Sequence, residues 1–417
     1  ICMFLNYKKW VIILKFKFDT FKFLLHLRTG WVFFVKNITA LVCLAAHKTF
    51  LFAVTWAAPP PKLDCIQSSS CRFVCFGQGM LDYSIPGMSD VMPYPSSIFG
   101  ALTSDQIDAY EQAFTKVIES AVNDYDPDII HSHHLWLASA VARKRFPVIP
   151  MVTSCHSTDL RQFQQCPHLR DRILSHCQKI GRILALSRSQ ANHICQLYSI
   201  PSDRIDIVGG GFDETLFSLR QKDKSSQVQL LYAGKLSFAK GVDVLLRTFQ
   251  SMNNGKIHLH LAGSGTGEEE QHCLDLSKKA GSSVTVHGRI SQQELARLMG
   301  RCDIFILPSF YEGLPLVLLE ALASGCRIIT TDLTGCKELL GNVEPDLVEF
   351  VQLPALKQID RPNPKDLPMI EKRLEKAINS MVAKVLVSPT PDRNKIENII
   401  AEFGWNAVFR KINAAYE

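Results

Sequence analysis

Two glutamates that flank a tight turn are the residues best suited to chemistry in this sequence. Glu312 and Glu320 lie eight residues apart, and Gly313 between them lets a ligand approach the backbone. An apolar run before the turn predicts a buried strand, and the run after it predicts a helix. The start of such a helix can bind an anion through the free amides of Leu314, Leu316 and Val317. The pattern therefore predicts a negatively charged ligand at this strand end.

Two lysines follow an earlier apolar run at 228–233. Lys235 and Lys240 flank a turn that begins and ends with glycine. Such point charges suit a doubly charged phosphate group where no metal supplies the positive charge. A second turn, with Gly263 and Gly265, follows the next predicted strand. A single Gly-x-Gly is weak evidence, but its position in the same predicted sheet places it near the lysines.

Histidines gather at a strand end in the first half of the chain. His131 and His133 would share one face of the strand that starts at 128. No cysteine or carboxylate with ligand spacing lies nearby in the sequence, so we predict no metal site and expect His133 or His134 to face a ligand. The Asp-x-Asp runs within 124–128 precede a strand and predict a turn.

Short apolar runs alternate with helical patterns twice along the chain. In the first half, the predicted strands are 11–14, 50–54, 71–76, 128–131, 148–154 and 183–186, and the predicted helices are 31–46, 103–122 and 189–198. In the second half, the strands are 228–233, 257–262, 284–287, 304–307 and 328–330, and the helices are 242–250, 268–280, 292–300 and 316–323. This alternation is typical of parallel sheets covered on both faces. We predict an α/β fold with two doubly wound, Rossmann-like domains.

Three glycines in a row, at 209–211, separate the two series. We predict an N-terminal domain at 1–208, a C-terminal domain at 209–400, and a final helix within 401–417 that packs back on the first domain. The loop at 80–94 is rich in Met, Pro and Tyr. It either shapes an acceptor pocket or is plain surface.

Composition excludes several classes of protein. The 417 residues are 47% apolar and 21% charged, which rules out a disordered or fibrous chain. The formal charge of +6 comes from residues 1–60, which hold eight Lys or Arg and one acid, and no nucleic-acid-binding motif accompanies them. We therefore expect no nucleic-acid partner. Thirteen cysteines without a Cys-x-x-Cys pair favour reduced thiols in a cytoplasmic protein.

The basic, aromatic segment at 1–60 is the part of the sequence that could contact a membrane. No uncharged run in it reaches the roughly 18–20 residues that a membrane span needs, and no clear cleavage site follows it. We expect neither a span nor a signal peptide. The composition favours peripheral contact with a membrane surface and a lipid-linked acceptor. The expected location is the cytoplasm, at the inner face of the membrane if this contact forms.

These motifs resemble those of the family-4 glycosyltransferases, which are retaining nucleotide-sugar enzymes of GT-B fold with two Rossmann-like domains facing across a cleft. Glu312 and Glu320 match the family's Glu-x7-Glu within Pro-Ser-x-Tyr-Glu-Gly. The lysine turn is similar to the family's diphosphate-binding turn, with Lys235 where arginine is usual. Residues 153–159 resemble its strand-end histidine motif, and 28–32 resemble its early glycine-rich loop.

The resemblance implies roles for individual residues. The lysines would hold the donor diphosphate, Glu320 the ribose hydroxyls, and Arg289 would lie in the base-binding loop. The implied donor-binding residues are Lys235, Lys240, Gly263, Gly265, Arg289, Gly313, Leu314, Leu316 and Glu320. The implied catalytic residues are His156, Glu312 and Lys240, and the implied acceptor-side residues are Gly30, His133 and Asp159.

The implied activity is transfer of a sugar from a nucleotide-diphosphate sugar to a hydroxyl of a glycan, lipid-linked or small-molecule acceptor. The configuration would be retained, and neither metal nor cofactor would be needed. A nucleotide-sugar epimerase or a phosphorylase on the same fold is an alternative. So is a non-catalytic nucleotide-binding relic, because Trp31 stands where a second glycine is usual. A dehydrogenase would need an early Gly-x-Gly-x-x-Gly, which residues 10–60 lack.

Overall fold

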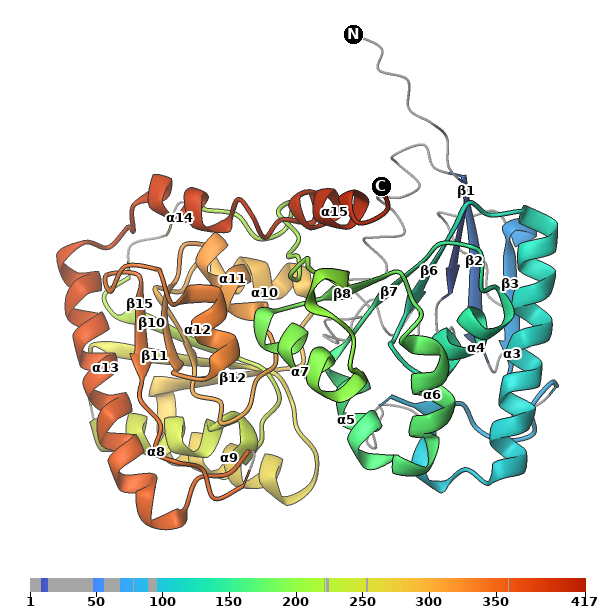
Figure 1. The fold of residues 1–417 in the computed structure, drawn as a ribbon. Coiled ribbons are helices and arrows are strands. Elements are labelled where there is room, and N and C mark those ends of the chain that lie inside the picture. Colours follow the sequence, from blue (N-terminus) through green and yellow to red (C-terminus); the bar gives the residue numbers. More distant parts are fainter. Residues whose placement is uncertain are drawn as a thin grey trace, which may run out of the picture. The chain divides into compact units, whose positions relative to one another are not determined.

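The chain divides into two compact α/β units (Figure 1). A computed structural model describes residues 9–13, 48–55, 68–77, 79–88, 96–220, 222, 225–252, 254–358 and 360–417. Unit 1 comprises Ile1–Gly209 and Val408–Glu417, and unit 2 comprises Gly210–Ala407. The predicted fold class is confirmed, because each unit contains a parallel sheet with the doubly wound strand order. The helix predicted at 31–46 lies outside the described residues.

Unit 1 contains a seven-stranded sheet in the order β3-β2-β1-β6-β7-β8-β9, and every pairing in it is parallel. The strands are β1 (Lys9–Ile13), β2 (Lys48–Thr55), β3 (Cys71–Cys75), β6 (Ile129–His133), β7 (Met151–Ser154), β8 (Arg182–Ala185) and β9 (Ile205–Ile207). A separate pair is formed by β4 (Pro86–Gly87) and β5 (Ser97–Ile98). The direction of winding reverses between β1 and β6, so the loop after β6 lies at a position where such sheets bind ligands.

Helices of unit 1 pack on this sheet through apolar stripes. The longest, α3 (Ser104–Tyr125), is capped by Thr103, whose side chain accepts the Gln106 amide while the Gln106 side chain accepts the Thr103 amide. It buries Ile107, Phe114 and other residues at helical spacing. The other helices are α4 (Leu137–Arg145), α5 (Ser157–Gln165), α6 (Arg170–Cys177), α7 (Arg188–Tyr198) and α15 (Trp405–Ala414), whose last part belongs to unit 1.

Unit 2 contains a six-stranded parallel sheet in the order β12-β11-β10-β13-β14-β15. The strands are β10 (Val228–Ala233), β11 (Ile257–Ala262), β12 (Val284–Gly288), β13 (Ile304–Leu307), β14 (Arg327–Thr331) and β15 (Val348–Val351). Winding reverses between β10 and β13. The turns after these two strands therefore leave the sheet on either side of the position where ligands bind in such folds.

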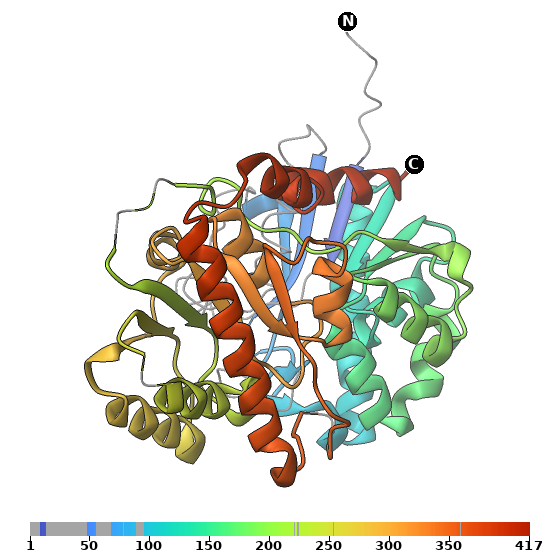
Figure 2. The same cartoon turned by 90° about the vertical axis from the view of Figure 1, so that its left-hand side faces the viewer.

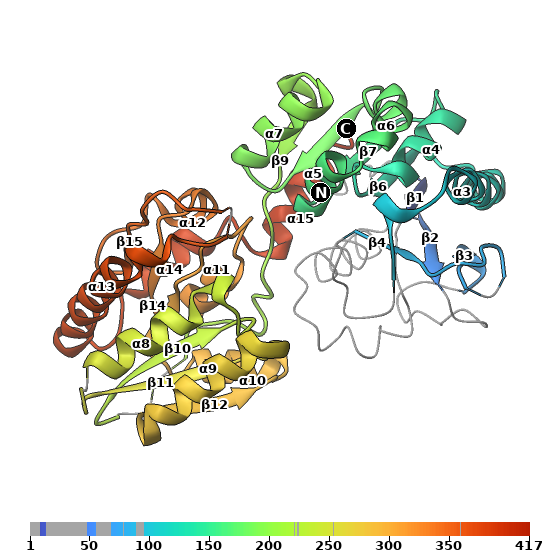
Figure 3. The same cartoon turned by 90° about the horizontal axis from the view of Figure 1, so that it is seen from below.

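Seven α-helices accompany the six strands within the described part of unit 2 (Figure 3). They are α8 (Val242–Met252), α9 (Gly267–Lys279), α10 (Gln292–Met299), α11 (Val317–Ala323), α12 (Thr334–Leu340), α13 (Leu367–Val387) and α14 (Arg393–Ile400). The long helix α13 crosses the sheet and contacts β10, β14 and β15 as well as α8 (Figure 2). The apolar faces of these elements form one continuous core.

One predicted strand is too long. The strand predicted at 148–154 begins only at Met151, and Val148 is 88% exposed. Pro147 and Pro150 lie on either side of Val148 and Ile149 and have no amide hydrogen to donate to a neighbouring strand. The first part of the apolar run is therefore loop. The loop predicted at 80–94 contains β4, and its residues 89–94 lie outside the described part of the chain.

Candidate functional site

The lysine turn after β10 is fastened to the glycine turn after β11. The Gly234 amide donates to the Ala262 carbonyl at 2.9 Å, and the Leu236 amide donates to the Ser264 carbonyl at 3.1 Å. Gly263 has a φ of +143°, and a Cβ built there would lie 1.8 Å from the Gly234 carbonyl oxygen. Only glycine fits this position, because a side chain would push the two turns apart.

The same lysine turn meets the turn after β13. A Cβ on Gly241, whose φ is +64°, would lie 2.1 Å from the Pro308 carbonyl oxygen, so the two backbones are in direct contact. Lys240 Nζ donates to Glu312 Oε1 at 2.7 Å and lies 3.4 Å from the Tyr311 carbonyl oxygen. The side chains of Lys240 and Glu312 are only 29% and 13% exposed. The structure thus joins two predicted catalytic residues in one half-buried ion pair.

The helix start after Gly313 differs in part from the prediction. The Leu316 amide donates to the Leu314 carbonyl at 3.0 Å, so the prediction that the Leu316 amide is free is wrong: the turn closes on itself. Within the described part of the chain, the amides of Leu314 and Val317 donate no hydrogen bond and remain candidates for an anion. Gly335 of α12 packs against this turn, since a Cβ there would lie 2.0 Å from the Gly313 carbonyl oxygen.

The remaining predicted donor residues sit on neighbouring elements. Glu320 lies in the first turn of α11, whereas Glu312 precedes that helix, so the two glutamates occupy separate elements. Lys235 has an exposed side chain, and its carbonyl accepts the Tyr232 hydroxyl at 2.7 Å. Arg289 is exposed directly after β12, whose last residue, Gly288, accepts the Gly263 amide at 2.7 Å.

Two acidic residues that the sequence analysis missed hold the donor turns in place. Glu269 Oε2 accepts the Phe238 amide at 3.0 Å, and Glu270 Oε1 accepts the Gly265 amide at 2.8 Å. Both glutamates lie in the first turn of α9. A cluster of acids is common at a helix start, where it complements the helix dipole, so the sequence pattern alone does not reveal these partners.

In unit 1, a buried carboxylate connects the loops after β6 and β7. Asp159 Oδ1 lies 2.6 Å from His134 Nδ1, and Asp159 Oδ2 accepts the amides of Leu135 and His156, each at 2.8 Å. His134 has a left-handed backbone with a φ of 72°, an uncommon conformation for a residue other than glycine. These three interactions of Asp159 connect the loops that follow the two strands.

The predicted acceptor-side histidine and the predicted catalytic histidine are neighbours. His133 Nδ1 lies 3.4 Å from His156 Nε2, and the two rings are stacked with centroids 5.7 Å apart. Burial lowers the pKa of His156 to about 3 and holds the pKa of His133 well below its ordinary value. Burial raises the pKa of Asp159, but the charge interactions and hydrogen bonds with His134 and His156 together outweigh this effect, so the pKa lies below its usual range. At neutral pH, His133 and His156 are therefore neutral and Asp159 is ionised. The third acceptor-side residue, Gly30, lies outside the described residues.

We expect unit 1 to lose stability as the pH falls below 6.5. An unfolded histidine takes up a proton near pH 6.5, whereas buried His156 does so only near pH 3, so protons favour the unfolded state between these values. At pH 5 the loss amounts to about 2 kcal/mol for each such histidine. Urea unfolding at pH 7.5, 6.5, 5.5 and 5.0 measures it. A free energy of unfolding that is constant over this range would contradict the expectation, and His156→Gln should make the slope shallower.

No metal-ligand group and no membrane helix is found in the described part of the chain. None of its clusters of His, Cys, Asp or Glu has three members placed to hold a metal ion. Asp126, in the Asp-x-Asp run, is the left-handed residue that ends α3, in agreement with a turn. None of its helices combines the length and the apolar character needed to cross a bilayer. Most of the basic N-terminal segment lies outside the described residues.

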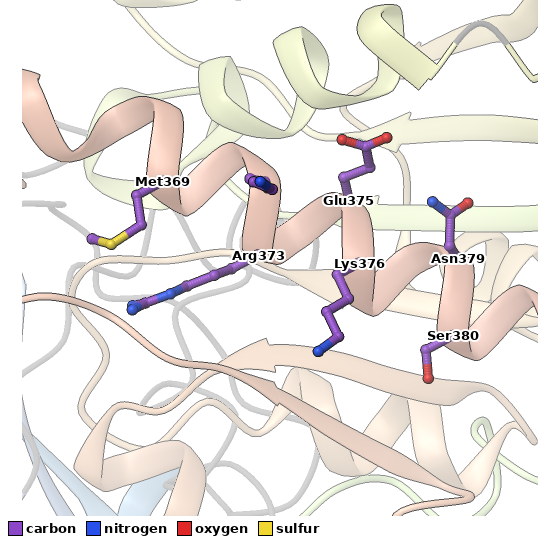
Figure 4. Close-up of a pocket in the computed structure, with 7 residues that line it drawn as sticks. Met369, Arg373, Glu375, Lys376, Asn379 and Ser380 are labelled. Carbon is purple, nitrogen blue, oxygen red and sulfur yellow. The ribbon is translucent and has the colours of Figure 1, made fainter.

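A surface pocket on α13 lies apart from these residues in the sequence (Figure 4). Its lining comes from one helix and is mostly polar or charged: Met369, Lys372, Arg373, Glu375, Lys376, Asn379 and Ser380. It includes none of the predicted site residues. The turns after β10, β11 and β13 therefore remain the candidate site of unit 2.

Comparison with known families covers both units. Residues 103–216 match Glycosyltransferase Family 4, and residues 216–350 match Glycosyl transferases group 1. Together these regions contain every predicted site residue except Gly30. The chain belongs to the group 1 glycosyltransferases of family 4.

Relatives of this family-4 glycosyltransferase are distant in sequence. It is 25% identical over 229 residues to the glycogen synthase of Mycobacterium tuberculosis (strain CDC 1551 / Oshkosh), a match that covers 52% of the chain and 55% of the relative. The chain spans about half the length of the curated relatives it matches.

Solved structures show the same fold over the whole chain. Sucrose-phosphate synthase from Thermosynechococcus elongatus superposes with a TM-score of 0.67 at 18% identity, over 98% of both chains. Anabaena HepE in complex with UDP and glucose superposes with a TM-score of 0.62 at 14% identity, over 98% of this chain and 99% of HepE. At such identities the likeness shows a shared fold, the GT-B fold of glycosyltransferases.

Proposed function

We propose that this glycosyltransferase moves a hexosyl group from a nucleotide-diphosphate sugar to an acceptor hydroxyl, with retention of configuration and without a metal or cofactor. The observation that carries the proposal is the ion pair of Lys240 with Glu312 where the turns after β10 and β13 meet. A cation at this position in a doubly wound sheet suits a pyrophosphate.

The donor turns supply electrostatic stabilisation of the leaving group. In the proposed reaction, the bond from the anomeric carbon to the phosphate oxygen breaks and a bond to the acceptor oxygen forms on the same face. The acceptor proton passes to the departing diphosphate, on which negative charge develops. The turns after β10 and β13 carry groups that can face that charge: Lys235, Lys240 and the amides of Leu314 and Val317, which donate no hydrogen bond. Such preorganised groups can do the work of a divalent ion.

Unit 1 contributes the groups for the transferred sugar and the acceptor. His156 and His133 are buried and neutral, so they can exchange hydrogen bonds with sugar hydroxyls without repelling positive charge on the anomeric carbon. Asp159 holds the backbone at His156 in place. The acceptor is proposed to be a hydroxyl of a glycan, a lipid-linked glycan or a small molecule. The HepE complex with UDP and glucose supports trying a uridine diphosphate sugar first.

A thermal-shift panel of UDP-, GDP- and ADP-glucose tests the donor site. One donor is expected to raise the melting temperature, because a ligand present at a hundred times its Kd stabilises the folded state by about 2.7 kcal/mol. Transfer to a mixture of sugar acceptors, with and without EDTA, then tests the reaction, and EDTA is expected to have no effect. No shift with any donor would contradict the proposal. Release of an epimerised sugar in the absence of an acceptor would favour the epimerase alternative.

A further inference from the structure

A tyrosine that follows α15 is hydrogen-bonded to the strand that carries the site histidines. Tyr416 is 6% exposed, and its hydroxyl lies 2.7 Å from Nδ1 of His131 in β6. His131 is fully buried, and its Nε2 lies 2.9 Å from the Ser154 hydroxyl at the end of β7. Both ring nitrogens of His131 are therefore engaged. All of these residues belong to unit 1.

Two stacked imidazole rings, those of His131 and His133, connect this hydrogen bond to His156. His131 and His133 are two residues apart on β6 and so lie on one face of the strand, with stacked rings whose centroids are 4.7 Å apart. His133 stacks in turn on His156 at 5.7 Å. A second connection runs along β7, because Ser154 lies two residues before His156. A shift of the His131 ring is thus transmitted to His156 both through packing and through the strand.

The Tyr416 hydroxyl is not the only buried group of this C-terminal segment, because Val408 and Ile412 of α15 are completely buried as well. What the hydroxyl adds is a hydrogen bond to the ring of His131. A neutral imidazole donates from one nitrogen and accepts at the other, and the hydroxyls of Tyr416 and Ser154 can each take either role. In either tautomer, the hydrogen bond to Nδ1 restrains the orientation of the His131 ring.

We propose that Tyr416 is a positioning residue of the acceptor side, whose hydroxyl fixes His131 and thereby orients His156. The inference rests on the proposed function of His156 and deepens it. It assigns to the segment after α15 a contribution to turnover, in addition to its packing. The donor turns belong to unit 2, so their affinity for a nucleotide sugar should not depend on this hydroxyl.

The test is Tyr416→Phe, which removes the hydroxyl and retains the ring. We expect kcat for transfer to fall about tenfold, as for other small displacements of a catalytic group, while the donor Kd stays unchanged. The matched control is Thr115→Val, which removes a hydroxyl that donates to the Glu111 carbonyl at 2.7 Å in the same unit. The control should leave kcat unchanged. His131→Asn should lower kcat similarly, and the double variant should fall no further.

Nitrogen-15 spectra of the histidine rings provide a readout that needs no substrate. In Tyr416→Phe the signals of both His131 and His156 should shift, and in Thr115→Val neither should. A shift of His131 alone, with normal kcat and a lowered melting temperature, would reduce Tyr416 to a structural role and overturn the inference. If the unmodified chain transfers no sugar, the proposed function fails. The His156 spectrum then still decides whether Tyr416 positions that ring.

Discussion

Replacement of Lys240 by alanine is expected to weaken binding of the nucleotide-sugar donor about a hundredfold. A charged hydrogen bond to phosphate contributes up to about 3 kcal/mol, and its loss accounts for most of this factor. The substitution also leaves Glu312, whose side chain is 13% exposed, without its cation and close to the incoming anion. Isothermal titration with the donor identified in the thermal-shift panel measures the change.

The control for Lys240→Ala is Lys384→Ala. Lys384 also forms a half-buried pair with a glutamate, since its Nζ lies 3.1 Å from Glu349 Oε2, but it belongs to α13. Loss of this pair should change the stability slightly and leave the donor affinity unchanged. Equal affinities for the unmodified chain and Lys240→Ala would place the diphosphate elsewhere and would remove the main support for the proposed function.

Gly263→Ala is expected to have the largest effect on stability, a loss of about 3–5 kcal/mol in the free energy of unfolding. The new Cβ would lie 1.8 Å from the Gly234 carbonyl oxygen, and the φ of +143° is unfavourable for any residue with a side chain. The lysine turn and the glycine turn would have to separate, so donor binding should also be lost. Urea unfolding and a thermal shift with the donor measure the two effects.

A matched substitution in the same unit is Gly255→Ala. No atom lies within 4 Å of a Cβ built on Gly255, so this variant should retain its stability and its donor affinity. A Gly263→Ala variant as stable as Gly255→Ala would mean that the two turns are not in the contact described. The donor site would then need to be rebuilt from other residues.

Local patterns were sufficient to predict most strands and their order of appearance. The ranges 228–233, 257–262 and 304–307 agree with β10, β11 and β13, because buried parallel strands are short, continuous apolar runs with polar or glycine ends. Residues at strand ends could be predicted for the same reason. The position of Lys240 beside Glu312 follows once the winding reversal between β10 and β13 is known.

Contacts between distant residues could not be predicted in this way. Gly335 lies inside a short helix, where glycine usually only lowers helix stability. The structure is needed to show that the Gly313 carbonyl packs directly on Gly335 and leaves no room for a side chain. His131 and Tyr416 are separated by 285 residues, and nothing in the sequence around Tyr416 connects it to the histidine run at 131–134. The elements between 341 and 400, β15 and α13 among them, were missed because no motif marks them.

Before a diphosphate binds, the positive charge of Lys240 is already compensated by the carboxylate of Glu312. When the diphosphate binds, it replaces the Glu312 carboxylate as the partner of Lys240. Few counterions are released, so the affinity for the diphosphate should change little with ionic strength. A singly charged anion offers Lys240 no advantage over the carboxylate already there. The site should therefore bind ligands with two phosphates in preference to the abundant monoanions of the cell.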